Sequence, residues 1–170
     1  MRGDLHTLKR ICEYASKVML AGCIIISLVL IAAMVLVAGS FVSDPMADVL
    51  YRAFNIESLD TVESASRMAE MILILILAVI TTQSIYRVMV SIRDEHSPFN
   101  EGNTSILIRL SKAYLIFPVP FGVLSYLASG ILAEALFMFF GCLFVGVVLY
   151  CYALIVRYGA VLQDESDHTL

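Results

Sequence analysis

Cysteine is the first residue type in this sequence that could perform redox chemistry. The chain holds four cysteines among 170 residues. Cys12 stands in a charged segment, whereas Cys23, Cys142 and Cys151 stand far from one another in apolar stretches. Membrane enzymes that handle disulfides use paired cysteines outside the bilayer, often spaced Cys-x-x-Cys. Since the sequence has no such pair, it disfavours thiol–disulfide exchange.

Histidine could serve as a metal or haem ligand, but its positions do not favour either role. All three histidines, His6, His96 and His168, lie outside the apolar stretches, where a haem protein would need its axial ligands. His168 has acidic neighbours that could gather a metal, yet a flexible end supplies no preorganised geometry, so we interpret it as a solvated tail. No nucleophile with its base is apparent. We therefore expect a protein that is not an enzyme and holds neither a metal nor a cofactor.

The elements that carry these residues are membrane helices. Hydrophobic residues make up 60% of the chain and charged residues 15%, which lies outside the range of soluble proteins. Four stretches lack Asp, Glu, Lys and Arg: 18–43, 71–86, 113–133 and 135–156. A helix needs about 20 apolar residues to cross a bilayer, and Arg87 can reach the interface and let the second stretch continue. We predict an all-α integral membrane protein of one domain, spanning at about 18–42, 68–92, 107–129 and 133–158.

The first apolar stretch is much longer than the core of a signal peptide, so we expect a retained helix. Orientation follows from lysine and arginine, which are enriched in cytoplasmic loops. Most of them fall before the first span, around the second connection, or after the fourth span, and Arg52 and Arg67 alone lie in the first connection. This bias predicts a plasma-membrane protein with both termini, the loop 93–106 and the tail 159–170 in the cytoplasm, and the loop 43–67 outside.

Local patterns predict further helices beside the spans. Asp44 and Pro45 predict a short helix in the outer loop, which either covers the spans or forms a lid over a ligand. Asp60 with Glu63 predicts the start of the second span's helix. The segment 4–19 is amphipathic, so it either lies on the inner membrane surface or binds a partner.

The polar residues within the spans are few. Gln83 lies one turn before Arg87, and an amide at this depth either forms an interhelical hydrogen bond or marks a translocation path. Pro118 and Pro120 predict a bend in the third span, which serves either packing or a hinge. We favour an interhelical contact at Gln83 and Arg87, and packing at the prolines.

Two cytoplasmic segments carry the most specific pattern: "SPFNEGNTSILIRLSKA" at 97–113 and "YGAVLQDESDHTL" at 158–170. In these segments and in its four spans, the chain resembles the family of small prokaryotic membrane proteins known as domain of unknown function 2975, over essentially its whole length. The positions that carry this resemblance, and that we consider candidates for partner binding, are Pro98, Phe99, Asn103, Leu162, Gln163, Asp164, Glu165, Asp167, Thr169 and Leu170.

No activity is established for that family. Its members are often encoded beside a small helix-turn-helix regulator, so the resemblance implies a cytoplasmic protein partner. The acidic tail could hold the basic recognition helix of such a regulator, or it could merely stay solvated or fold back onto Arg93, Arg109 and Lys112.

We therefore expect a noncatalytic regulatory or docking protein in the lipid bilayer. A small transporter, channel subunit or accessory component is the alternative, with a path past Gln83 and the prolines. The cytoplasmic segments lack a glycine-rich phosphate loop and a basic stripe with interleaved aromatics, so direct nucleic-acid binding is not expected. Assembly into a homo-oligomer is left open.

Overall fold

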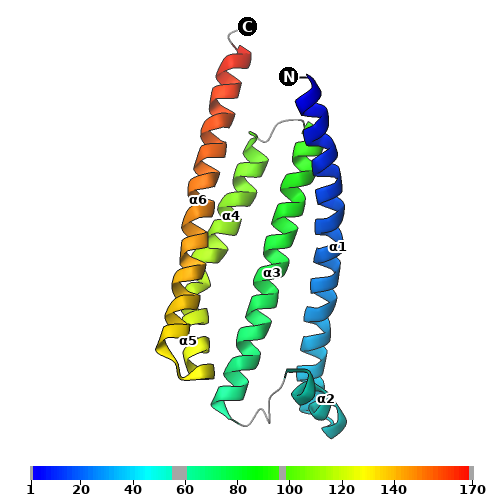
Figure 1. Cartoon of the computed structure of the whole chain (residues 1–170), viewed down its shortest axis with the longest axis vertical. Helices are drawn as coiled ribbons and strands as arrows, with labels where there is room; N and C mark the ends of the chain where they lie inside the picture. The colour runs from blue at the N-terminus through cyan, green and yellow to red at the C-terminus, as the bar shows by residue number, and fades with distance from the viewer. Residues whose placement is uncertain (1, 55–60, 96–98, 169–170) are drawn as a thin grey trace.

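The computed structural model describes residues 2–54, 61–95 and 99–168, and it describes side chains for residues 10–54, 61–94 and 99–165. Within these ranges every element is a helix (Figure 1): α1 (Arg2–Ser40), α2 (Asp44–Phe54), α3 (Val62–Glu95), α4 (Glu101–Ile116), α5 (Pro118–Ser129) and α6 (Leu132–His168). Four segments are long and apolar enough to cross a membrane: 10–40, 62–94, 101–129 and 132–165. The predicted all-α, four-span class is confirmed.

The third span consists of α4 followed directly by α5. The backbone of Phe117 stays helical, with φ −66° and ψ −22°, and its N–H donates to the carbonyl of Ala113 at 3.0 Å. Pro118 then lacks the N–H that would reach the carbonyl of Tyr114 one turn earlier. The thiol of Cys142 in α6 donates to that carbonyl instead, with an S–O distance of 3.6 Å. A group on a neighbouring helix thus replaces the bond that proline removes.

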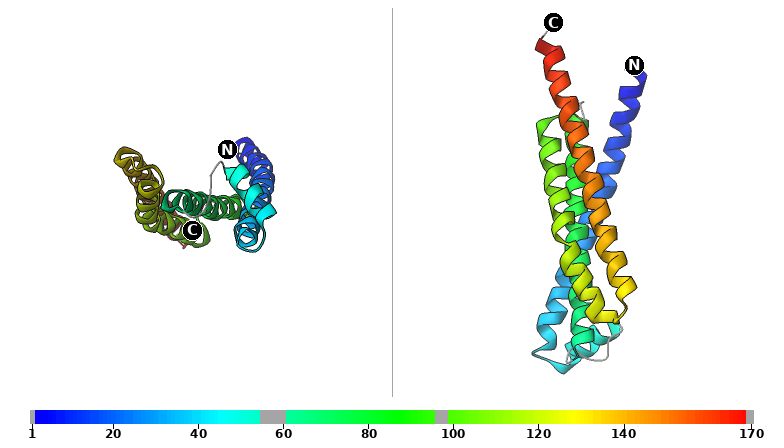
Figure 2. Two further views of the ribbon diagram at one scale, coloured as in Figure 1. Left: turned by 90° about the horizontal axis from the view of Figure 1, so that it is seen from below. Right: turned by 90° about the vertical axis from the view of Figure 1, so that its left-hand side faces the viewer.

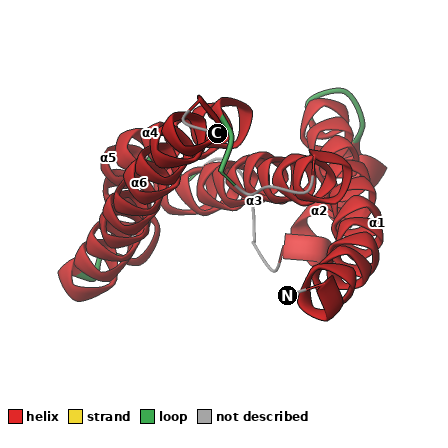
Figure 3. Ribbon diagram, turned by 90° about the horizontal axis from the view of Figure 1, so that it is seen from above, coloured by secondary structure: helices red, strands yellow, loops and turns green. Residues whose placement is uncertain are grey.

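The spans pack side by side in the order of the chain. α1 contacts α3, α3 contacts α4 and α5, and α6 contacts α4 and α5. Seen from either end, α3 lies between α1 and the group formed by α4, α5 and α6 (Figures 2 and 3). The spans therefore form an open layer, in which α1 and α6 stand at opposite edges. Many large apolar side chains of α1 and α6 remain exposed, as is expected of helices that face lipid.

The short helix predicted in the outer loop is present as α2, with its start at Asp44. The carbonyl of Ser43 accepts from the N–H groups of Met46 and Ala47 at 3.1 and 3.2 Å. Leu50 is fully buried, and α2 packs against the end of α1. α2 thus packs on α1, at one edge of the spans.

The start of α3 differs by one residue from the predicted cap. Asp60 lies outside the described residues, and the hydroxyl of Thr61 accepts from the N–H of Ser64 at 3.2 Å. A threonine side chain at this position satisfies one of the free N–H groups of the first turn. Thr61 therefore caps α3.

Candidate functional site

The starts of α1 and α4 and the ends of α3 and α6 lie at one end of the molecule (Figure 1), which we call the termini face. The tail is part of α6 there. α6 has 37 residues, so it is about 55 Å long, whereas the hydrocarbon core of a bilayer is about 30 Å thick. The last turns of α6 therefore project from the membrane as an acidic helical extension, in which Leu162, Asp164 and Glu165 are exposed.

The start of α4 is fixed by Asn100. Its backbone is extended, with φ −135° and ψ 160°, and its side-chain oxygen accepts from the N–H of Asn103 at 2.6 Å. Its amide nitrogen donates to the hydroxyl of Ser91 in α3 at 2.9 Å. Asparagine is among the best residues for capping a helix, because it satisfies a backbone N–H that has no helical partner. Asn100 thus caps α4 and also ties it to α3.

Phe99 brings the start of α4 and the extension of α6 together. A Cβ atom built at Gly159 would overlap the ring of Phe99, so the ring lies directly on the backbone of α6. Glycine permits such a close approach because it has no side chain. Residues 60 positions apart in the sequence are thereby joined at the termini face.

Close packing continues from this contact toward the membrane. Leu107, Ala153 and Val156 form a buried cluster between α4 and α6, with Ile108 packed against it. Further along, a Cβ atom at Gly146 would lie 3.1 Å from the carbonyl carbon of Tyr114. Small residues let two membrane helices approach closely, and here they hold α4 and α6 together below the termini face.

A groove of about 830 Å³ lies between α4 and α6 at the termini face, and we call it the α4–α6 groove. Its lining is half polar and includes both basic and acidic side chains: Phe99, Asn100, Glu101, Thr104, Ser105, Ile108, Arg109, Lys112, Arg157, Ala160, Val161, Asp164 and Glu165. Its volume lies within the range of ligand pockets, about 300 to 1,000 Å³.

Charge is divided along this groove. Arg109 and Lys112 lie toward the membrane in α4, while Asp164 and Glu165 lie toward the end of α6. Arg157 stands between them on α6, about 10 Å before Asp164 at 1.5 Å per residue. The groove therefore presents a basic part beside the membrane and an acidic part away from it.

The candidate partner-binding residues have different positions in the structure. Phe99, Asp164 and Glu165 line the α4–α6 groove, and Leu162 and Gln163 are exposed on the α6 extension. Asn103 is 1% exposed, because its place in the first turn of α4 turns it inward, so its side chain is not available to a partner. For the others the structure gives no side chain: Asp167 belongs to α6 by its backbone alone, and Pro98, Thr169 and Leu170 lie outside the described residues.

Sequence reasoning used Arg109, Lys112 and Arg157 to orient the chain and did not place them together in one site. The spacing of Arg109 and Lys112 does put them on one face of a helix. The position of Arg157 in the same groove depends on how α4 and α6 pack, and the sequence carries no signal for that register.

The predicted interhelical contact of Gln83 and Arg87 is not what joins α3 to α4. Both side chains are exposed, on a different face of α3 from Thr81. Instead the hydroxyl oxygens of Thr81 and Tyr114 lie 3.0 Å apart. The hydroxyl of Thr81 also donates to the carbonyl of Leu77 at 2.7 Å, so its single proton is used and Tyr114 must be the donor to Thr81.

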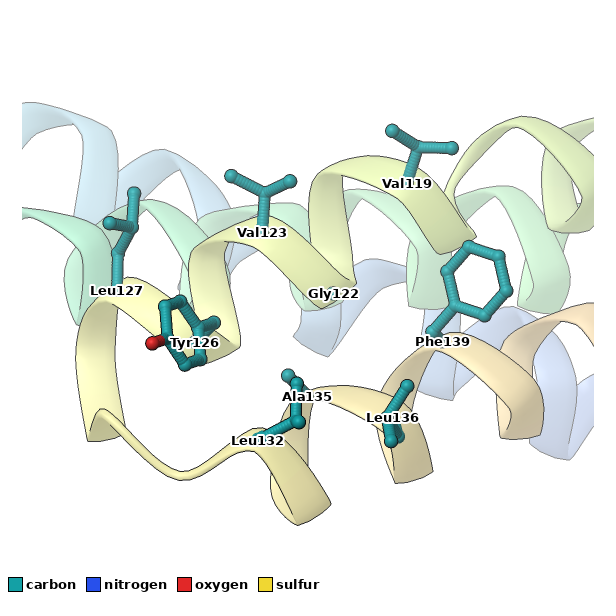
Figure 4. A pocket seen from close by; sticks show the side chains of 9 residues that line it. All are labelled: Val119, Gly122, Val123, Tyr126, Leu127, Leu132, Ala135, Leu136 and Phe139. Carbon is teal, nitrogen blue, oxygen red and sulfur yellow. The ribbon is translucent and has the colours of Figure 1, made fainter.

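A second groove lies between α5 and α6 at the opposite end of the molecule (Figure 4). It has a volume of about 330 Å³, and valine, leucine and aromatic side chains form its walls. In Figure 4 the hydroxyl of Tyr126 is the one side-chain oxygen among the residues drawn. Such a lining suits a hydrocarbon chain and offers no group for acid–base or metal chemistry.

No protein-family model, curated protein or solved structure matches this chain. The resemblance to domain of unknown function 2975 stays a prediction from the sequence.

Proposed function

We propose that this chain is a noncatalytic membrane protein that docks a cytoplasmic protein partner at its termini face. The observation that carries the proposal is the contact of Phe99 with the backbone at Gly159. It places the two segments that resemble the family side by side, on a surface that includes the α4–α6 groove and the α6 extension. A surface assembled from both segments is what a docking role requires.

The chemistry of this surface favours a basic partner. Asp164 and Glu165 are exposed near the end of a projecting helix, where solvent and partner both have access. Opposite charge accelerates association and selects among partners more than it adds affinity. A small DNA-binding protein of the helix-turn-helix type carries such a basic surface, so the extension would compete with DNA phosphate for it.

The proposed docking surface extends beyond the tail. A stable protein interface buries about 800 Å² on each partner, more than a short tail supplies. The α6 extension offers Val161 and Leu162 as exposed apolar contacts, and the start of α4 adds Phe99 and Glu101 beside them. Together α4 and α6 provide a continuous area in which apolar contacts lie among charges.

The experiment compares captured proteins from the native host. The whole chain, a chain ending at Leu162, and the double variant Asp164→Asn/Glu165→Gln are purified in mild detergent, and co-purifying proteins are identified by mass spectrometry. The matched control is Asp44→Asn/Asp48→Asn, which removes the same charge from α2 at the other end of the molecule.

The proposal expects one small basic DNA-binding protein to co-purify with the whole chain and the control, and to be lost with the truncated and double variants. The captured protein should then bind the purified whole chain, with an affinity that falls as salt rises. Equal recovery of the same proteins with all four chains would contradict docking at the α6 extension.

A further inference from the structure

We infer that the basic part of the α4–α6 groove binds the phosphate of an anionic phospholipid headgroup. This inference goes beyond the proposed function and does not depend on it. Three cationic side chains from two helices, Arg109, Lys112 and Arg157, line one groove together with the hydroxyl-bearing Ser105. Cationic side chains and hydroxyl donors within one groove are the groups that recognise a phosphate.

Among the side chains that the structure describes, no carboxylate forms an ion pair with these three cations. In the described part of the chain, the ion pairs within 4.0 Å are Lys17–Glu13, Arg67–Glu63 and Arg93–Asp94, all of them within α1 or α3. Arg93 is thus engaged by its neighbour Asp94. The basic part of the groove therefore retains its positive charge for a ligand.

The groove lies at the level where lipid phosphates are found. Arg157 immediately follows the uncharged stretch 135–156 and marks the boundary of the hydrocarbon region on α6. Since Leu107 packs with Ala153 and Val156, and Tyr114 lies beside Gly146, Arg109 and Lys112 lie deeper than Arg157, and their long side chains can extend toward the boundary. Basic pockets between membrane helices at this boundary bind anionic lipid headgroups.

The walls of the groove also fit a lipid. Ile108, Ala160 and Val161 supply apolar surface beside the cations, and the buried cluster of Leu107, Ala153 and Val156 packs α4 against α6 at this level. A glycerophospholipid has a matching arrangement, because its charged phosphate lies next to its apolar chains. A free phosphate ion would use the cations but leave the apolar walls in contact with water.

The two arginines favour an anion with several oxygens, such as phosphate, over an anion with a single charged atom. The guanidinium groups of Arg109 and Arg157 present planar pairs of N–H donors, which match two phosphate oxygens at once. Lys112 adds a flexible ammonium on the membrane side. The groove is therefore expected to bind phosphatidylglycerol and to bind phosphatidylcholine only weakly, because the phosphatidylcholine headgroup has no net charge.

The experiment measures lipid binding to the full chain purified in mild detergent. Native mass spectrometry counts lipids retained after addition of phosphatidylglycerol or phosphatidylcholine, and thermal unfolding gives the shift in Tm for each lipid. The test variant is Arg109→Gln/Lys112→Gln/Arg157→Gln. The matched control is Arg10→Gln/Arg52→Gln/Arg87→Gln, which removes the same charge from three exposed cations outside the groove.

The expected result is a bound phosphatidylglycerol and a raised Tm for the natural chain and the control, and at least a tenfold weaker affinity in the test variant. A second variant, Arg109→Lys/Arg157→Lys, keeps the charge and separates loss of binding from loss of fold. It should bind more weakly than the natural chain and more strongly than the triple variant.

Three results would overturn the inference. The first is equal binding of phosphatidylglycerol and phosphatidylcholine. The second is equal loss of binding in the test and control variants, which would assign the effect to net charge. The third is a Tm shift with inorganic phosphate as large as that with the lipid, which would make the site one for a free anion. The acidic residues of the proposed docking surface are unchanged in all these variants, so the outcome is independent of partner capture.

Discussion

The ring of Phe99 fills the space that a side chain at Gly159 would occupy. Phe99 stands directly before Asn100, the cap of α4, so this contact joins the start of α4 to the last turns of α6. The next residue, Asn100, is hydrogen-bonded to both α3 and the first turn of α4. The α6 extension is therefore fixed by specific packing at its base.

A methyl group at Gly159 should interfere with the Phe99 ring. We expect Gly159→Ala to lower the free energy of unfolding by about 1 to 3 kcal/mol, as overpacked substitutions do. In a chain that already carries Phe99→Ala, the same change should cost much less, because the ring is gone. Chemical unfolding of the four chains in detergent gives the coupling energy, and additive effects would show that the two residues do not touch.

The close approach of α4 and α6 at Gly146 can be tested with a second glycine as control. In Gly146→Ala the new methyl group would meet the backbone at Tyr114, which cannot move aside easily, so we expect a loss of about 1 to 3 kcal/mol. Gly141 has open space around it, and Gly141→Ala should change stability little. Equal thermal stability of the two variants would contradict the observed packing.

The hydroxyl pair of Thr81 and Tyr114 should contribute a measurable interaction within the membrane. Interhelical hydrogen bonds there average about 0.6 kcal/mol, with a maximum near 1.7. We expect Thr81→Val and Tyr114→Phe to show a coupling energy of this size in a double-mutant cycle. Gln83→Leu is the comparison: since Gln83 is exposed, it should show no coupling with Tyr114→Phe.

The two bonds of Asn100 can be separated by substitution. Asn100→Ala should lower the free energy of unfolding by about 1 kcal/mol or more, because the cap of α4 is lost together with the bond to Ser91. Asn100→Asp keeps the acceptor for the N–H of Asn103 and loses the donor to Ser91, so a smaller effect is expected. Thermal unfolding ranks the variants, and a larger loss with aspartate would contradict the assigned roles.

The predicted orientation leads to a simple assay. Reporter enzymes that are active on one side of the membrane can be fused after Leu170 or inserted into the loop 43–67. We expect a fusion after Leu170 to report the cytoplasm and an insertion in the loop to report the outside, because lysine and arginine are enriched at the termini face. The reverse pattern would place the α6 extension outside and exclude a cytoplasmic partner.

The number and position of the spans could be predicted because burial in lipid imposes a long apolar run on each of them. The missing hydrogen bond to the carbonyl of Tyr114 also followed from the sequence, since proline removes a backbone donor wherever it stands. The caps were harder: Asp60 and Thr61 are both good capping residues, and the backbone selects one of them. Such choices depend on local geometry that residue type does not specify.

Contacts between spans could not be predicted in the same way. Gln83 and Thr81 are both polar, and the sequence analysis singled out Gln83 alone for an interhelical contact. Which of them faces α4 is decided by the rotation of α3, and a helix that is apolar all round gives no clear sign of its rotation. The α4–α6 groove could not be predicted for the same reason. To place its three basic residues together, one must know both the rotation of α4 and its register with α6.

The open layer of spans has a consequence for how the chain enters the membrane. Each span packs against the spans next to it in the sequence, as the contacts of α1 with α3 and of α4 and α5 with α6 show. A growing polypeptide could therefore settle every helix against one already inserted, without waiting for a later segment to complete it. The chain could then be expressed as two fragments, one ending at Glu95 and one beginning at Phe99. Each would insert as a helical hairpin, and the two would associate in the bilayer.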